Sequence, residues 1–259
     1  MSAGLGTQVG NLARRSVTRT FRQPAQIVPA VIFPMFLLAV NSGGLQRATN
    51  IPGFPTKSYL TFALAIPFMQ GALFSVMNAG TDLARDIETG FLNRLALTPL
   101  SSASLLTGLL GGALVLGIVQ AVVYLTVGVA AGASFAAGFP GVLVIVALSM
   151  LLAIGFGCIG LFVALRTGSG EAVQSMFPVF FVFLFLSSMN LPRNLIQTDW
   201  FREVATYNPV SYLIEAIRSL LIKGWDGEAL ALGFGIAGVI AVVAMVAAST
   251  SMRTRLVRT

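Results

Sequence analysis

Side chains that could carry out catalysis are scarce in this sequence. It contains no histidine, one cysteine (Cys158) and nine aspartates and glutamates, so the commonest general base and any multi-cysteine metal site are missing. The two lysines, Lys57 and Lys223, do not follow a GxxxxG run, so the chain offers no phosphate-binding loop. No acid lies in the middle of an apolar run, where ion-coupled transporters keep theirs. We predict a chain without catalytic, cofactor or metal sites, which would need another protein to supply energy for any uphill work.

The longest polar interruption in the first two-thirds of the chain runs over residues 82–101. Within it, Gly90 sits between two short helical patterns and permits an elbow. Apolar residues recur at every fourth position, as on one face of a helix: Leu83, Ile87, Phe91 and Leu95. Polar residues take the other side: Asp82, Arg85, Asp86, Asn93 and Arg94. Such an elbow cannot span a bilayer, and we interpret it as a docking element for a cytoplasmic motor protein. An ordinary interhelical loop is the alternative interpretation.

The composition is that of a membrane protein. Hydrophobic residues make up 56% and charged residues 10% of the chain, whereas soluble domains carry about 25% charged residues. A net charge of +7 could suggest a nucleic-acid partner, but the arginines gather at the edges of apolar runs, where basic side chains anchor a protein to anionic head groups. We therefore predict an all-α, polytopic membrane protein with no nucleic-acid partner. The first apolar run starts near Ile27, too late for a cleavable signal peptide.

Six apolar stretches are long enough to cross a bilayer as helices. We place these spans at residues 27–45, 57–80, 103–131, 140–165, 172–191 and 229–249. Prolines are expected to kink the first span at Pro29 and Pro34 and the second at Pro67. Residues 27–259 would thus form one membrane domain. With the N-terminus inside, cytoplasmic segments hold more Lys and Arg than external ones, which predicts both termini in the cytoplasm of a cell whose inner (plasma) membrane holds the chain.

Residues 1–26 are predicted to form an amphipathic helix that lies in the membrane interface. Four arginines group on one side of a helical wheel: Arg14, Arg15, Arg19 and Arg22. Apolar residues lie opposite: Leu5, Val9, Leu12 and Val17. We expect the apolar face to sit in the head-group region of the lipids. A disordered basic tail is the alternative.

The segment 192–228 is amphipathic and is predicted to lie outside the cell as a helical, re-entrant element. Asn208 and Pro209 suit the cap and first position of a helix, and Gly224 suits its end. Such a helix is roughly 22 Å long, too short to cross ~30 Å of hydrocarbon. Glu215 and Arg218 stand three positions apart, a spacing that predicts an ion pair.

Two motifs give the chain a family resemblance. The cytoplasmic loop contains D-x-x-x-D-x-E-x-G-x-x-x-R-L-x-x-T-P, and the external segment contains N-P-V-x-Y-x-x-E-A-x-R. In this order, with a basic N-terminal helix and six spans, the chain resembles the membrane subunit of type-2 ABC exporters, and the bacterial daunorubicin-type permeases of the drug-resistance branch most of all. The resemblance covers nearly the whole chain. The loop departs from the usual glutamate-rich version at Thr89 and Phe91.

The resemblance implies roles for several residues. Those that match the coupling loop, which contacts the ATPase subunit, are Glu88, Gly90, Arg94, Thr98 and Pro99, joined by Asp82 and Asp86. For the two aspartates a solvated helix face is an equal alternative. Those that match the external element, which caps the translocation path, are Asn208, Pro209, Tyr212, Glu215 and Arg218. The path itself would run between the second and fifth spans, with candidate lining from Phe68, Met69, Gln70, Phe177, Phe180 and Phe181. Core or lipid-facing packing is the alternative for these six.

The resemblance also implies an assembly of two permease chains, identical or different, with two ATPase chains that bind ATP and Mg²⁺. We expect this chain to be the non-enzymatic permease of an ATP-driven exporter that moves an amphiphilic or hydrophobic cargo: a drug, a lipid or a lipid-linked glycan. The alternative is a motor-independent channel or scaffold. A channel would need polar residues along one face, and those available do not share one: Gln70, Asn78, Gln120 and Gln174.

Overall fold

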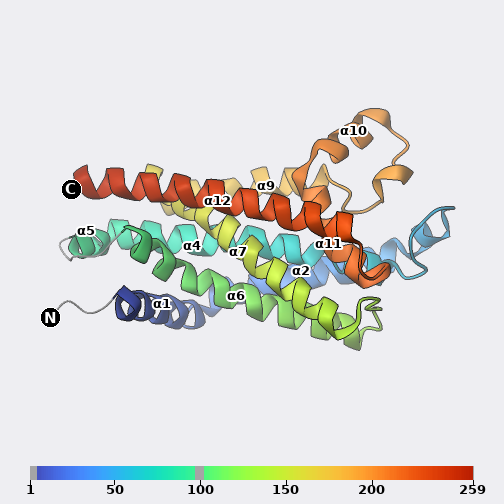
Figure 1. Ribbon diagram of the computed structural model, residues 1–259, viewed down its shortest axis with the longest axis horizontal. Coiled ribbons are helices and arrows are strands. Elements are labelled where there is room, and N and C mark those ends of the chain that lie inside the picture. The colour runs from blue at the N-terminus through green and yellow to red at the C-terminus, as the bar shows by residue number, and fades with distance from the viewer. Residues whose placement is uncertain (1–4, 97–101, 259) are drawn as a thin grey trace.

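The computed structural model describes residues 5–96 and 102–258, and its elements are all helical in these ranges. The long helices run side by side along the longest axis of the molecule (Figure 1). One end of this bundle, the α5 end, holds α1 (Leu5–Phe21), α5 (Phe91–Ala96) and the C-terminal part of α12 (Gly227–Arg258). The other, the α10 end, holds α10 (Asp199–Tyr207) and α11 (Pro209–Ile222).

Five helical segments of the described chain are long and apolar enough to cross a membrane. They are α2 (Pro24–Gly44), α3 (Tyr59–Ala63) together with α4 (Ile66–Glu88), α6 (Ser102–Ala130), α7 (Gly138–Thr167) and α12. The composition thus indicated the correct class, an all-helical polytopic membrane protein. The N-terminal helix α1 stops at Phe21, five residues before the predicted boundary of the interfacial segment, because α2 already begins at Pro24.

The predicted fifth span is not one continuous helix. Residues 172–191 instead contain most of α8 (Gly170–Gln174) and all of α9 (Met176–Phe185), followed by a non-helical stretch. The break has a local cause. Pro178 cannot donate to the carbonyl of Gln174, and its ring clashes with that carbonyl, so α8 ends there. The pair spans roughly 24 Å, less than a bilayer core.

The second predicted span is likewise divided into two helices, α3 and α4. Pro67 does not kink a helix but starts one, because α3 ends at Ala63, four positions earlier, and Pro67 occupies the first turn of α4. Helix α4 then continues through Glu88, so the first half of the expected elbow, residues 82–88, is the end of this long helix. The elbow itself is at Gly90, whose φ is +69°, as its position indicated.

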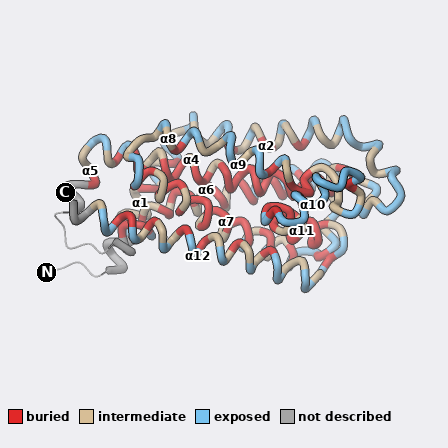
Figure 2. The backbone as a smooth tube through the Cα atoms, turned by 90° about the horizontal axis from the view of Figure 1, so that it is seen from above, coloured by how far each residue is buried: buried red, intermediate tan, exposed pale blue. Residues whose placement is uncertain are grey.

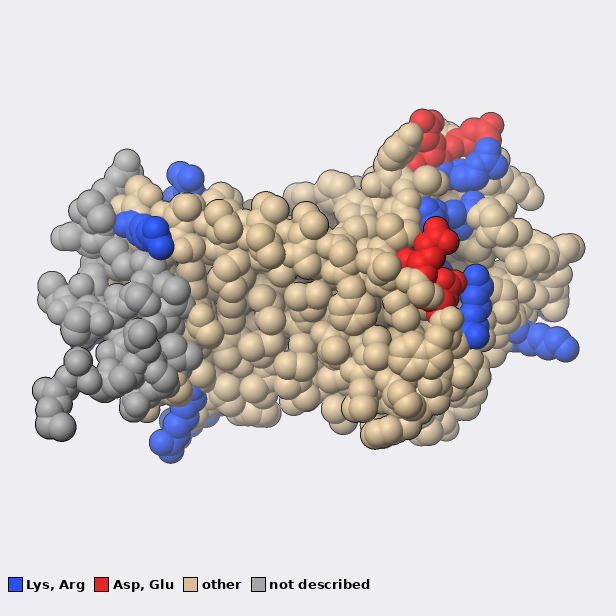
Figure 3. Space-filling view, in the orientation of Figure 1, with Lys and Arg blue, Asp and Glu red and all other residues tan. Residues whose placement is uncertain are grey.

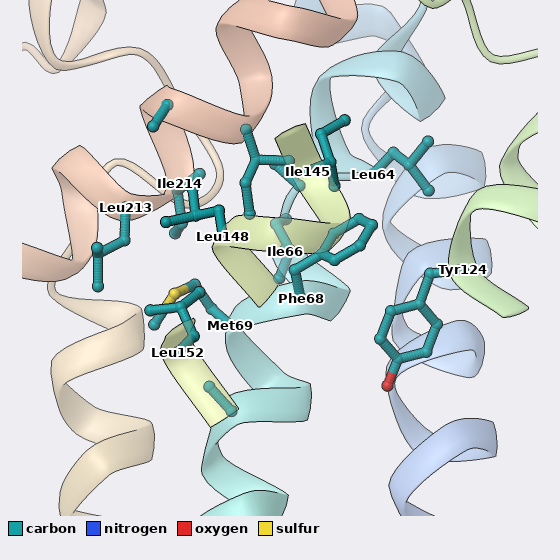
Figure 4. Packing of buried hydrophobic residues seen from close by; sticks show 14 of the residues in the cluster. Leu64, Ile66, Phe68, Met69, Tyr124, Ile145, Leu148, Leu152, Leu213 and Ile214 are labelled. Carbon is teal, nitrogen blue, oxygen red and sulfur yellow. The ribbon is translucent and has the colours of Figure 1, made fainter. Parts of the chain in front are cut away.

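The core lies between α4 and α7, which are buried along most of their length (Figure 2). The two helices touch where Gly80 meets Gly160: a Cβ added to Gly160 would lie 2.1 Å from the carbonyl oxygen of Val76. Small residues at such a crossing allow the backbones to approach closely. Toward the α10 end, side chains from α3–α4, α7 and α11 interdigitate in one apolar cluster (Figure 4).

Proline in α2 is accommodated by a neighbouring helix. Pro34 leaves the carbonyl of Ala30 without its usual intrahelical donor. Gln120 and Tyr124, one turn apart on α6, both donate to that oxygen, at 2.9 Å and 2.8 Å. The interior polar groups of α6 therefore have a structural task, since an unsatisfied carbonyl is costly inside a membrane.

Candidate functional site

Two arginines of α1 bind two aspartates of α4 at the α5 end. Arg15 forms a bidentate pair with Asp86, Nη1 to Oδ2 at 2.9 Å and Nη2 to Oδ1 at 2.8 Å. Arg19 donates from Nη1 to Asp86 Oδ1 at 2.9 Å, and its Nε forms an ion pair with Asp82 Oδ1 at 3.0 Å. Both pairs stand one turn apart on their helices, so the two rows meet in register. Hydrogen bonding to Asp86 raises the pKa of the Arg15 guanidinium.

Arg15 also joins this cluster to α5. Its guanidinium carbon lies 3.8 Å from the ring centroid of Phe91, the first residue of α5, a geometry that attracts a cation to the ring face. We call Arg15, Arg19, Asp82, Asp86 and Phe91 the α1–α4–α5 junction. It ties the N-terminal helix, the end of α4 and the start of α5 together.

Helix α1 is packed against the rest of the protein, on α4 and α6. Ser16 donates to Leu109 O and accepts from Gly112 N, each at 3.0 Å. A Cβ on Gly108 would lie 2.4 Å from Leu12 Cβ, so α6 needs glycine there. The predicted arginine face therefore divides: Arg14 and Arg22 stay exposed, whereas Arg15 and Arg19 turn to α4. The helical wheel could not indicate this division, because the acids that bind two of the four arginines lie some 70 residues away in sequence.

The predicted coupling residues fall into two groups. Asp82 and Asp86 face α1, and the Asp86 side chain is 5% exposed, so neither lies on an open docking surface. Their inward position follows from the two arginines, which the loop motif alone could not indicate. Glu88 and Arg94 are exposed on either side of Gly90. Thr98 and Pro99 lie outside the described residues.

At the α10 end, Asn208 caps two helices at once. Its Oδ1 accepts from Val210 N at 3.0 Å, which begins α11 with Pro209 in the first turn, as the sequence indicated. Its Nδ2 donates to the carbonyls of Phe183 and Leu186, at 2.7 Å and 2.9 Å. No local sequence pattern indicates that Asn208 also caps the C-terminal end of α9.

The predicted ion pair between Glu215 and Arg218 was wrong. Glu215 binds Arg193 instead, through Nε at 2.9 Å and Nη2 at 2.6 Å. Arg218 is 6% exposed and donates to the carbonyls of Phe62, Ser188 and Met189, at 3.1, 3.0 and 3.0 Å. Helical spacing brought the two side chains within reach, but tertiary partners bind each of them better.

Two further contacts complete this region. The Arg218 guanidinium lies over the ring of Phe62, 3.5 Å from its centroid, and burial lowers the pKa of Arg218 to about 9, so it stays charged at neutral pH. Tyr212 donates to Thr206 O at 2.8 Å, which fixes α10 against α11. Arg218 therefore joins α3, α11 and the stretch after α9, at the level where α10 folds over the bundle (Figure 1).

Half of the predicted path residues are buried. Phe68, Met69 and Gln70 are 3%, 1% and 2% exposed, and Figure 4 shows the first two inside the core. They were assigned to a path because the family resemblance places it between the second and fifth spans, but the packing of α7 and α11 around α4 covers them. As placed in the single chain, they line no open route.

The other three path residues lie at the edge of the core. Phe177 and Phe181 stack at 5.3 Å; Phe177 also contacts Phe74, and Phe181 contacts Phe33 of α2, at 6.1 Å. Phe180 packs on Phe156. Beside them an apolar surface of α2 and α9 is open, formed by Val28, Ile32, Phe36, Val40, Val179, Val182, Phe183 and Phe185. We call it the α2–α9 face. The sequence analysis did not include α2 in such a surface. The spacing of four between its exposed apolar residues, which places them on one face of the helix, was a signal for it.

Among the described residues, no group of three or more Cys, Asp or Glu side chains could hold a metal ion. At the α5 end Arg15 and Arg19 bind Asp82 and Asp86, and at the α10 end Arg193 binds Glu215 while Arg218 binds the backbone. The geometry therefore supports binding and mechanical roles.

Comparison with known proteins extends this result. A family model described as "ABC-2 type transporter" matches residues 7–222. The chain is similar to a putative transport permease ycf38 of Pyropia yezoensis, 27% identical over 222 residues, which covers 85% of this chain and 75% of that protein. It is also similar to a probable doxorubicin resistance ABC transporter permease protein DrrC of Mycobacterium tuberculosis (strain ATCC 25618 / H37Rv), 26% identical over 211 residues, which covers 81% and 75%.

Proposed function

The chain belongs to the ABC-2 type transporter family and is a transmembrane permease subunit of an ABC transporter, and from this premise we propose that it exports an amphiphilic or hydrophobic cargo with energy from a separate ATPase subunit. The observation that carries the proposal is the α1–α4–α5 junction. It connects α5, a short helix that carries the exposed Arg94, to the most deeply buried long helix of the bundle, α4.

In the proposed assembly two ATPase subunits bind ATP and Mg²⁺ and contact the α5 ends of two permease chains. Glu88 and Arg94 are exposed on either side of the elbow and are the side chains available for that contact. A movement of α5 would reach α4 through the backbone at Gly90 and α1 through Arg15. The α5 end, with both termini, would then face the cytoplasm from the inner membrane, in accord with the positive-inside rule.

We assign the cargo path to the space between two permease chains along the α2–α9 face. This face is apolar and rich in phenylalanine, with Phe177, Phe180 and Phe181 at its inner edge. Such a surface suits a flat hydrophobic drug or a lipid, and the mycobacterial relative is named for doxorubicin resistance. Phe68, Met69 and Gln70 are no longer part of the proposed lining.

A motor-independent channel is the weaker candidate. Polar side chains of the interior, such as Gln120, Ser75 and Ser149, surround a cavity of about 10 Å³. That volume is at most one water molecule. A water-filled route along these residues would need a different arrangement of α4, α6 and α7.

The test is purification of the full chain with the ATPase subunit that copurifies, followed by ATP-dependent uptake of doxorubicin into inside-out vesicles. Glu88→Ala combined with Arg94→Ala is expected to weaken copurification and to lower uptake about tenfold, as loss of two interface contacts allows. Arg14→Ala, an exposed charge at the same end, serves as the matched control. If wild type moves the drug without ATP, or no ATPase copurifies, the proposal is wrong.

A further inference from the structure

A cavity of about 740 Å³ lies at the α10 end. It lies between the loop at Gly53, the turn at Arg193, helices α10 and α11, and the first turns of α12. This is away from the α1–α4–α5 junction. Figure 3 shows acidic and basic side chains gathered together at this end, beside a middle band that carries neither.

The cavity is lined by side chains of both charges. Its basic residues are Arg193, Arg202, Arg218 and Lys223, and its acidic residues are Glu215, Asp226 and Glu228. A purely anionic ligand would therefore meet three carboxylates, and a purely cationic ligand would meet four basic groups. A ligand that carries one group of each sign suits this lining.

Part of the lining is rigid. Arg218 is held by three backbone carbonyls, and Arg193 is held by both oxygens of Glu215 and by the ring of Tyr212, 4.4 Å from its guanidinium carbon. Bidentate arginine–carboxylate pairs keep a defined geometry. These side chains are already fixed, so a ligand would bind them without having to order them.

The rest of the charged lining is loosely held. Arg202 pairs with Asp199, whose side chain is 88% exposed, and Lys223 Nζ stands 3.7 Å from Asp226. Exposed pairs of this kind contribute little to stability, so either cation can turn to a bound anion. The Glu228 carboxylate forms no ion pair within residues 5–96 and 102–258. It is available for a ligand ammonium group.

An apolar track leaves the mouth of the cavity. Leu232 lines the cavity and begins a stripe on one face of α12 that continues through Val239, Val243 and Val246, all between 41% and 64% exposed. Their spacing of seven, four and three residues keeps them in line on a helix. Because α12 is a candidate membrane span from Gly227 onward, the cavity lies where the hydrocarbon region begins, at the level of lipid head groups.

We propose that this cavity binds the head group of a zwitterionic phospholipid of the phosphatidylethanolamine class, with one acyl chain along the α12 stripe. Arg202 and Lys223 face the phosphodiester, and Glu228 accepts from the ammonium group. The head group would enter beside Leu232, where the cavity meets the exposed apolar stripe of α12. The site is independent of the ATPase contact and of the cargo, so it stands or falls separately from the export function.

The test is native mass spectrometry of the purified full chain with phosphatidylethanolamine and, in parallel, with phosphatidylglycerol, which lacks the ammonium group. Wild type is expected to retain phosphatidylethanolamine about tenfold more strongly, as one charge-assisted contact allows. Lys223→Gln with Glu228→Gln is expected to abolish the preference. Arg47→Gln with Glu203→Gln, exposed charges at the same end that do not line the cavity, is expected to keep it.

Equal retention of both lipids by wild type would overturn the proposal, and so would equal loss of the preference in the control variant. Free phosphoethanolamine distinguishes a lipid from a soluble ligand, since displacement of the lipid at equal concentration would also overturn it. If the double variant does not fold, Leu232→Ser at the exposed mouth replaces it. That variant is expected to retain long-chain phosphatidylethanolamine less strongly than wild type does, and to retain the dihexanoyl form equally well. An equal decrease in the retention of both lipids would contradict an acyl chain along the α12 stripe.

Discussion

Arginines organise both ends of the bundle, but in different ways. At the α5 end, Arg15 and Arg19 bind carboxylates across two helices, and Arg15 remains 38% exposed. At the α10 end, Arg218 is almost fully buried and donates to neutral backbone carbonyls. Charge pairs near the surface are screened by salt and can separate, whereas a buried guanidinium leaves its carbonyls unpaired if it moves. The comparison indicates that the ion pairs at the α5 end can separate, whereas the contacts of Arg218 hold the α10 end rigidly.

The largest effect is expected for Arg218→Met. Three carbonyls from two other segments lose their donor, and the free energy of unfolding should fall by about 3–5 kcal/mol, as for a broken buried polar network. Thermal unfolding of the purified chain in detergent measures this. Arg47→Gln, an exposed arginine at the same end, should change stability by less than about 0.5 kcal/mol. Equal effects of the two substitutions would show that the α10 end is not held by Arg218.

A smaller effect is expected for Asp86→Asn. The substitution keeps the size of the side chain but removes the charge that both arginines share, so the chain should lose about 1–3 kcal/mol. Because the pairs lie partly in solvent, the difference from wild type should shrink in 1 M NaCl, unlike the effect of Arg218→Met. Glu88→Gln, an exposed acid half a turn away, is the matched control. A salt-independent loss would contradict the distinction between the two ends.

The smallest effect is expected for Phe91→Leu, which removes the ring under Arg15 and keeps an apolar side chain. We expect a loss of about 0.5–1 kcal/mol. A double-mutant cycle with Arg15→Gln isolates the contact, and the two losses should add to more than the double variant shows. Phe36→Leu, exposed on α2, controls for the loss of a ring elsewhere. Strict additivity would mean that α5 is not tied to α1 through this contact.

Local rules predicted much of the helical framework. Long uncharged runs identified α6 and α7 to within two residues at most ends, because a membrane helix must be apolar over its whole length. Gly90 and the Asn208–Pro209 pair were found because backbone conformation and helix capping depend on neighbours in sequence. The breaks before α4 and α9 were open to the same reasoning: in each case a proline stands four positions after the carbonyl at which the preceding helix ends.

The partners of the charged residues could not be found in this way. Asp86 binds arginines 67 and 71 positions away, and Arg218 binds a carbonyl 156 positions away. For Glu215 and Arg218 the sequence indicated only a pair with each other. In the structure Glu215 binds Arg193, and Arg218 binds backbone carbonyls.

The sequence by itself determined that the chain is helical and lies in a membrane, because these properties depend on which residues are present and on their local order. Only the tertiary structure decided that α1 is bound to α4, that Phe68 and Met69 are core residues, and that a cavity with both charges opens beside α12. The physical reason is that burial and ion pairing depend on which helix faces become neighbours, and no local pattern specifies that.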